Sequence, residues 1–204
     1  MDNKPPRRGL LSAHALLLAA LLVGAVAPVL VYELGSRHHE RPDVQMGGPF
    51  TLNDGDGLTV TDRTYRGKWM LVYFGYTFCP DVCPTTLSDI ASALAKLGSR
   101  AADVAPLFIT VDPERDTAPV MREYVRAFDS RIIGLTGTPA QVAAVARKYH
   151  VFYQKADNGT QGNDYLVDHS ALIYVIDPSG QFAAYSSHGT TSDAIASGLK
   201  QLMD

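Results

Sequence analysis

Residues 69–84 have the sequence WMLVYFGYTFCPDVCP, in which an apolar run leads directly into two cysteines. The run at residues 69–74 has the length of a strand and is rich in aromatic and β-branched side chains, which predicts a strand buried on both faces. A helix is expected to follow, with Pro84 in its first turn. Its apolar face is expected to consist of Leu87, Ile90, Leu94 and Leu97.

Strands and helices are expected to alternate on both sides of this stretch. Upstream, residues 49–53 and 58–61 flank a DGDG sequence, which is typical of a hairpin turn. Downstream, a second apolar run at residues 107–111 predicts another strand. The helix after it is expected to have one face that consists of Val120, Tyr124 and Phe128.

A third helix is predicted from the sequence TPAQ at residues 138–141, which has the form of a capping box with proline at the first helical position. The apolar residues of this helix are Val142, Val145 and Tyr149. Residues 171–176 and 181–185 then form two strands around a DPSG turn. The final helix is expected to have an apolar face of Ile195, Leu199 and Leu202. This order of elements predicts an α/β fold with a mixed sheet flanked by helices.

Composition limits both the number of domains and the class of partner. The chain has 204 residues, 46% hydrophobic and 19% charged, which suits one globular domain and one membrane segment. The formal net charge is −3 and no Lys/Arg-rich run occurs, so nucleic acid is not an expected partner.

The segment at residues 9–32 contains no Asp, Glu, Lys or Arg. As a helix it would be about 36 Å long, enough to cross a hydrocarbon core of about 30 Å. Positive charges before it predict that residues 1–8 are cytoplasmic. Residues 33–48 are then a linker, and residues 49–204 a domain on the periplasmic side of the inner (cytoplasmic) membrane, held by a single-pass anchor. The alternative is a signal peptide cleaved after Ala27, but Pro28 is expected to block that cleavage.

Cys79 and Cys83 are the only two cysteines of the chain, and each precedes a proline. A residue before proline avoids the α conformation, so both are expected in a loop that ends where a helix begins at Pro84. This loop follows the carboxyl end of a buried strand, where open α/β sheets hold ligands. The helix N-terminus also favours thiolates. A structural disulfide, two inert buried thiols and a zinc site remain as alternatives, although zinc favours four ligands.

His169 is the candidate third ligand. If the strand after it runs antiparallel to residues 69–74, His169 lies at the same sheet edge as the cysteines, although a structural role for the imidazole is equally compatible. Two thiolates and an imidazole suit Cu(I), and with an added oxygen ligand they suit Cu(II). Asp112 and Asp116 follow the second strand, so they are candidate outer-shell groups or parts of a solvated loop. His38 and His39 are read as a solvated pair.

Three segments resemble the signature segments of the Sco/SenC family: GYTFCPDVCP at residues 75–84, VDPERDT at 111–117 and DYLVDHS at 164–170. The resemblance covers about residues 49–204 and implies a thioredoxin-like fold, with a copper ion bound by Cys79, Cys83 and His169. It also implies an N-terminal anchor and a role in building the dinuclear copper centre of cytochrome c oxidase. The partner would then be the copper-bearing oxidase subunit, and other copper chaperones are further candidates. Phe78 departs from the family pattern, because many members have histidine there.

A different class of function also fits the two cysteines. The pair could serve as a redox-active dithiol in a thiol-disulfide oxidoreductase or redox sensor that acts on the cysteines of the oxidase subunit, although such motifs usually have two intervening residues rather than three. A peroxiredoxin-like peroxidase would share the fold. His169 discriminates between these hypotheses, because disulfide exchange does not need a third soft ligand.

Overall fold

The computed structural model describes residues 46–156 and 164–204. The predicted anchor at residues 9–32, His38 and His39 lie outside these residues. Within them, no helix has both the length and the apolar character needed to cross a membrane.

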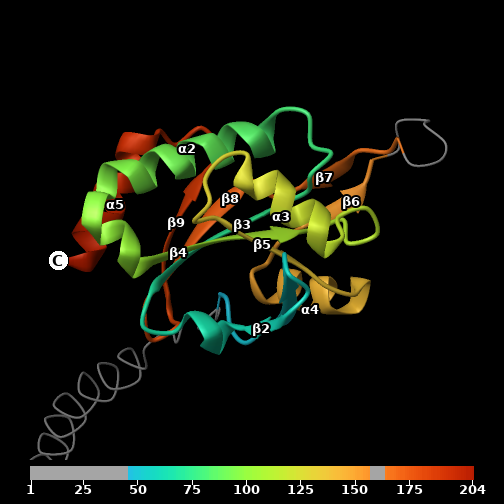
Figure 1. Ribbon diagram of the computed structural model, residues 1–204, viewed down its shortest axis with the longest axis horizontal. Helices are drawn as coiled ribbons and strands as arrows, with labels where there is room; N and C mark the ends of the chain where they lie inside the picture. The colour runs from blue at the N-terminus through green and yellow to red at the C-terminus, as the bar shows by residue number, and fades with distance from the viewer. Residues whose placement is uncertain (1–45, 157–163) are drawn as a thin grey trace, which may run out of the picture. The chain divides into compact units, whose positions relative to one another are not determined.

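A seven-stranded mixed sheet forms the centre of the fold (Figure 1), and its strand order is β2-β1-β5-β4-β3-β8-β9. Two further strands, β6 and β7, pair only with each other. The strands are β1 (Thr51–Asp54), β2 (Thr59–Thr61), β3 (Trp69–Gly75), β4 (Val104–Thr110), β5 (Ile133–Thr136), β6 (Tyr153–Lys155), β7 (Val167–His169), β8 (Leu172–Ile176) and β9 (Phe182–Ser187). The helices are the 3-10 helices η1 (Asp62–Tyr65) and η2 (Gly98–Asp103) and the α-helices α2 (Val82–Leu97), α3 (Ala118–Arg126), α4 (Pro139–Lys148) and α5 (Ser192–Met203).

Strand directions determine which loops meet at each edge of the sheet. β3, β4 and β5 are parallel, so the loops that follow β3 and β4 lie at the same edge. β8 is antiparallel to β3, and its N-terminal end therefore lies at this edge too. The sequence-based expectation of a mixed sheet flanked by helices is confirmed.

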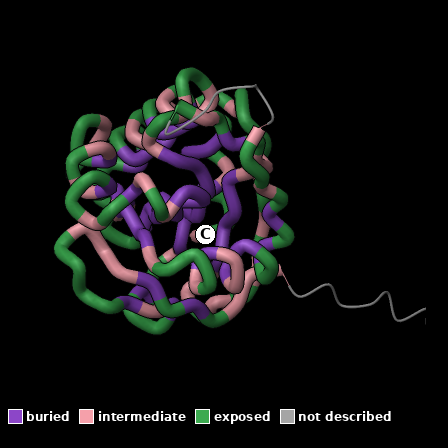
Figure 2. Tube along the Cα trace, turned by 90° about the vertical axis from the view of Figure 1, so that its right-hand side faces the viewer, coloured by how far each residue is buried: buried purple, intermediate pink, exposed green. Residues whose placement is uncertain are grey.

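The sheet separates two apolar layers because its central strands alternate their side chains. Met70, Val72 and Phe74 of β3 face a cluster covered by α4. Leu71 and Tyr73 face the other cluster, which α2, α3 and α5 cover. Figure 2 shows the buried segments at the centre of the trace and the exposed ones around them. A strand buried on both faces has few ways to shift, so the end of β3 is a rigid support.

Several local predictions are confirmed. Residues 51–61 form the expected hairpin, with β1 antiparallel to β2. The capping box at α4 is present: the Gln141 amide N–H donates to Thr138 Oγ1 over 3.2 Å, and the Thr138 N–H donates to Gln141 Oε1 over 2.8 Å. In α5, Ile195 and Leu199 are buried as expected, whereas Leu202 is exposed.

Other local predictions were wrong. α2 begins at Val82, so Cys83 belongs to the first turn of the helix and not to the loop. Proline is tolerated two residues into a helix because the first four N–H groups have no helical partner. β4 begins at Val104 and contains Pro106, which is tolerated because pairing with β5 starts only at Leu107.

The buried face of α3 also differs from the expected one. Met121 and Val125 are buried, whereas Val120 is exposed. Tyr124 and Phe128 pack against the same core cluster while partly buried. The apolar stripe is therefore displaced by about one residue from the predicted stripe, since positions i and i+1 on a helix point about 100° apart.

Candidate metal centre

Cys79 and Cys83 lie at the carboxyl end of β3, on the connection to α2. Cys83 is buried in the first turn of α2, and Cys79 is partly buried in the loop before it. The Cys83 amide N–H donates to Cys79 Sγ over 3.4 Å. Both cysteines are free thiols. A backbone N–H at a helix N-terminus stabilises negative charge, so this contact favours a thiolate at Cys79.

The core of the sheet encloses the Cys83 sulfur. The Tyr73 hydroxyl donates to Cys83 Sγ over 3.7 Å. A Cβ atom at Gly75 would lie 2.6 Å from Cys83 Sγ and 2.7 Å from the Phe108 ring, which is closer than real contacts allow. Only glycine lets the end of β3 approach the sulfur this closely. Gly75 was not singled out from the sequence, although glycine at a strand end indicates close backbone approach.

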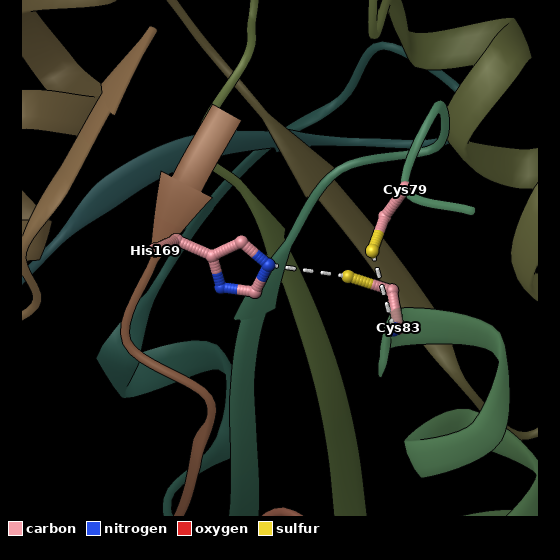
Figure 3. A group of neighbouring side chains, drawn as sticks. All are labelled: Cys79, Cys83 and His169. Atoms are coloured by element: carbon pink, nitrogen blue, oxygen red, sulfur yellow. Dashed lines mark hydrogen bonds between the residues drawn. The ribbon is translucent and has the colours of Figure 1, made fainter. Parts of the chain in front are cut away.

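His169 ends β7 and faces the same two sulfurs, as Figure 3 shows. Its Nε2 atom lies 3.4 Å from Cys83 Sγ, and its Nδ1 atom lies 3.1 Å from the Ser170 carbonyl oxygen. A carbonyl only accepts hydrogen bonds, so this contact places a proton on Nδ1. In the neutral imidazole, Nε2 then has a lone pair that can bind a metal ion, whereas a protonated Nε2 donates to the sulfurs. The antiparallel pairing of β8 with β3 brings His169 to this edge, as the sequence analysis required.

The two thiols titrate differently. A hydrogen bond from Cys83 is the largest factor that lowers the pKa of Cys79, to about 4, and His169 adds to it. The same hydrogen bond, together with burial, raises the pKa of Cys83. At neutral pH one thiolate is therefore present at Cys79, and Cys83 keeps its proton until another cation replaces it.

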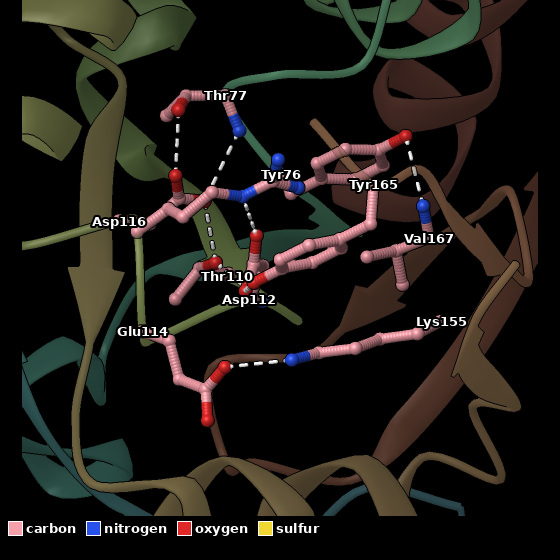
Figure 4. A network of polar contacts seen from close by, with 10 residues as sticks. Tyr76, Thr77, Thr110, Asp112, Glu114, Asp116, Lys155, Tyr165 and Val167 are labelled. Atoms are coloured by element: carbon pink, nitrogen blue, oxygen red, sulfur yellow. Dashed lines mark hydrogen bonds and ion pairs between the residues drawn. The ribbon is translucent and has the colours of Figure 1, made fainter. Parts of the chain in front are cut away.

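Asp112 and Asp116 are buried in the loop after β4 and contact the two segments that carry the sulfurs and the imidazole (Figure 4). Asp116 accepts hydrogen bonds from the Thr77 N–H and hydroxyl, over 3.0 and 2.6 Å, and from the Thr110 hydroxyl over 2.6 Å. Asp112 accepts from the Tyr165 hydroxyl over 2.7 Å and from Arg115. Burial is the largest influence on Asp116 and raises its pKa. Asp116 thus holds the segment before the cysteines, and Asp112 holds the segment before His169. That the two carboxylates support the ligands of a bound metal ion stays a proposal.

The three candidate ligand atoms form one compact donor set. Those of Cys79, Cys83 and His169 all lie within 4.8 Å of one another, and they form the only group of its kind in residues 46–156 and 164–204. Two sulfurs and one nitrogen without a carboxylate suit a soft metal ion. A structural zinc site usually has four protein ligands, whereas this group offers three.

Some residues at the site were missed by the sequence analysis. The β6–β7 ribbon was not predicted, because its three-residue strands are too short to show periodicity. Tyr165 and Arg115 were quoted only within motifs, and no spacing rule links them to a strand far away in sequence. Tyr76, whose ring edge meets His169 with centroids 5.8 Å apart, gave no signal of its own.

Comparison with known proteins assigns the chain to a family. A family model described as SCO1/SenC matches residues 38–204. The chain is 43% identical over 155 residues to the SCO1 homolog 1 of Arabidopsis thaliana mitochondria, covering 76% of this chain and 46% of that protein. It is 40% identical over 165 residues to the human mitochondrial SCO1 homolog, covering 80% of this chain and 54% of that protein. The chain therefore spans about half the length of these two relatives.

Solved structures agree with this assignment. ScoI of Bradyrhizobium japonicum, solved with copper bound, is 44% identical with a TM-score of 0.71, over 76% of this chain and 98% of that chain. The mixed sheet with flanking helices matches the thioredoxin-like structures of Sco proteins. The fold, the family model and the relatives agree, and the chain belongs to the SCO1/SenC family.

Proposed function

We propose that this protein is a copper metallochaperone that carries copper on Cys79, Cys83 and His169. The observation that carries the proposal is the compact set of two sulfurs and one imidazole nitrogen at the sheet edge. A copper-bound structure of a relative that is 44% identical supports the same cargo. Two thiolates and an imidazole suit Cu(I), and an oxygen or solvent ligand would complete a site for Cu(II).

The difference in burial between the two sulfurs suits a carrier that must release its cargo. Cys83 is enclosed by the core, whereas Cys79 is partly exposed and already ionised at neutral pH. An incoming ion would meet Cys79 first and displace the proton of Cys83 as it binds. A receiving protein would approach from the Cys79 side, since thiolate exchange needs access to sulfur.

The proposed recipient is the copper-bearing subunit of cytochrome c oxidase, where the copper would enter the dinuclear centre. Membership of the SCO1/SenC family supports this recipient. Other copper chaperones are candidate donors of the ion. Delivery is a proposal for the whole protein, and the described domain is the part that would hold copper.

The proposed location is the periplasmic side of the inner membrane. Residues 9–32 would form a single-pass anchor, residues 1–8 would be cytoplasmic and residues 33–48 would be the linker. The uncharged segment and the positive charges before it support this topology. The domain at residues 49–204 would then work within reach of membrane-bound oxidase subunits.

A thiol-disulfide oxidoreductase or redox sensor is the second candidate function. One observation favours it: Cys79 combines partial exposure with a pKa of about 4, whereas Cys83 is buried with a raised pKa. This asymmetry suits an attacking thiolate and a resolving thiol. Such an enzyme would act on the cysteines of the oxidase subunit without holding a metal.

His169→Ala tests the copper proposal against the redox alternative. Loss of a residue that only supports a ligand typically costs about 10- to 100-fold in metal affinity. Removing the imidazole opens a ligand position, so we expect copper affinity to fall by about 100-fold or more and the Cu(II) spectrum to change. The Cys79–Cys83 dithiol should still oxidise at a similar potential, because exchange depends on thiolate character and access. Copper titration of the reduced protein and a redox titration measure the two properties.

The matched control is His150→Asn. His150 is an exposed histidine in a left-handed backbone conformation that asparagine tolerates. It should leave both properties unchanged. In cells at limiting copper, His169→Ala should lose oxidase assembly. Normal assembly in that variant would reject copper delivery and favour the reductase.

A further inference from the structure

Arg115 contacts aromatic rings from two segments that carry the candidate ligands. Its guanidinium carbon lies 4.7 Å from the centre of the Phe78 ring and 3.8 Å from that of the Tyr165 ring. Phe78 directly precedes Cys79, and Tyr165 lies four positions before His169. A planar cation stacks favourably on aromatic faces, so one side chain packs against both the cysteine loop and the histidine-bearing segment.

A buried carboxylate fixes the orientation of this guanidinium. Asp112 accepts hydrogen bonds from Arg115 Nε and, over 2.7 Å, from the Tyr165 hydroxyl. The side chains of Asp112 and Arg115 are only 3% and 15% exposed. Figure 4 shows Asp112 and Tyr165 in this network. Asp112, Arg115 and Tyr165 therefore each contact the other two. The hydrogen bond between the charged groups of Arg115 and Asp112 is largely buried, so salt screens it only weakly.

A third aromatic residue joins the same two segments. The Tyr76 hydroxyl accepts a hydrogen bond from the Val167 N–H over 3.2 Å, and its ring edge faces the His169 imidazole. The Arg115 guanidinium also lies 5.8 Å from the centre of the Tyr76 ring. Val167 and His169 both belong to β7, which pairs with β6 and not with the main sheet. These side-chain contacts, the burial of Val167 in the core and the two-residue connection to β8 together hold β7 in place.

We infer that Arg115 is a positioning residue of the proposed copper site, which sets where the His169 imidazole lies relative to the two sulfurs. This inference rests on the proposed function. Arg115 acts through Tyr165 and Phe78, because a guanidinium has no lone pair to offer a metal ion. Without the stack, β7 would keep its pairing with β6 but lose its fixed distance from the loop of Cys79.

Arg115→Lys tests the inference, because lysine keeps the charge beside Asp112 but loses the planar face that stacks on the two rings. Outer-shell substitutions at metal sites typically cost 10- to 100-fold in affinity, and we expect copper binding to weaken by about tenfold or more. The same substitution in a His169→Ala background should change affinity by less than about twofold, because no imidazole is left to position. Titration of the four reduced proteins completes the cycle.

Arg122→Lys is the matched control, because Arg122 pairs with Asp56 at the surface over 2.7 Å and should leave copper affinity unchanged. Unchanged affinity in Arg115→Lys, or an equal loss in both backgrounds, would overturn the positioning role. If Arg115→Lys does not fold, as judged by circular dichroism, Tyr165→Leu takes its place in the same cycle. Failure of the proposed function has a different signature: the wild-type protein then binds no copper, or His169→Ala binds it as tightly as the wild type.

Discussion

The main sheet and the β6–β7 ribbon hold their parts of the site by different means. At the end of β3, Cys83 sits among Tyr73, Gly75 and Phe108 in a closely packed core. At the end of β7, His169 contacts the Ser170 carbonyl and the Tyr76 ring. Its segment is also held by the hydrogen bond from Tyr165 to the buried Asp112 carboxylate. Packing thus fixes the Cys83 sulfur, and polar and aromatic contacts fix the imidazole.

This difference indicates how each region should respond to change. Close packing resists added volume but tolerates salt and pH, because it contains few charges. A polar and aromatic network tolerates small changes of shape but depends on charge and hydrogen-bond geometry. The proposed site therefore combines a rigid half, which is Cys83 at the end of β3, and an adjustable half, which is His169 at the end of β7. Substitutions can be chosen to disturb one half at a time.

Gly75→Ala should have the largest effect, because it adds volume to the rigid half. The new Cβ would lie 2.6 Å from Cys83 Sγ and 2.7 Å from Phe108, both of which are buried. Overpacking of this kind costs about 1–3 kcal/mol, and we expect the upper end of that range. Chemical denaturation measures the loss, and copper affinity should fall because the sulfur is displaced.

Gly198→Ala is the control for this substitution. Gly198 lies within α5 and has open space where a Cβ would be added. Alanine favours helices over glycine, so the free energy of unfolding should stay equal or increase. If Gly75→Ala were as harmless as Gly198→Ala, the view that close packing fixes the Cys83 sulfur would be wrong.

Asp116→Asn should have an intermediate effect, because Asp116 joins the rigid half to the cysteine loop. The Asn oxygen can accept from the Thr77 N–H and the Thr110 hydroxyl, and the Thr77 hydroxyl can turn to accept from the Asn amide. The charge assistance of these bonds is lost, but the cost of burying a charged carboxylate is removed as well. We therefore expect unfolding at pH 7 to become easier by at most about 1 kcal/mol.

The cost of Asp116→Asn should depend on pH in a defined direction. Burial raises the pKa of Asp116 in the folded protein. The folded state therefore binds this proton more readily than the unfolded state. The stability that protonation contributes is fully present below the pKa of the unfolded state, and it is lost as pH rises through the pKa of the folded state. The difference in unfolding free energy between wild type and variant should thus be larger near pH 4 than at pH 7. A difference that grows with pH would mean that hydrogen bonds to the charged carboxylate outweigh burial.

The rigid half could be predicted from the sequence to a large extent. The run at residues 69–74 is continuous and apolar, and the TPAQ capping box at 138–141 is a local signal, so both elements were predicted within one residue of their observed limits. The start of α2 was misplaced because the rule that residues before proline avoid the α conformation was given more weight than the tolerance of first-turn proline. Local rules succeed where one interaction dominates and fail where two compete.

The adjustable half could not be predicted to the same extent. His169 was identified by its chemistry and by a hypothesis about strand direction, which β8 confirms. The stack of Arg115 on Phe78 and Tyr165 joins three segments that are far apart in sequence. Such contacts depend on side-chain geometry that no periodicity encodes, so they appear only once the fold is known.

Lys155→Met should have the smallest effect, although Lys155 also lies over the Tyr165 ring, 4.2 Å from its centre. Lys155 pairs with Glu114 over 2.8 Å, but these side chains are 57% and 60% exposed, so solvent and salt screen the pair. Methionine keeps much of the apolar stem that packs on the ring. Copper affinity should change by less than about twofold, and hydrogen exchange of the Val167 amide should stay as slow as in the wild type. If Lys155→Met instead loosened β7 as much as Arg115→Lys, the surface ion pair would hold the ribbon, and the contrast between its buried and exposed contacts would disappear.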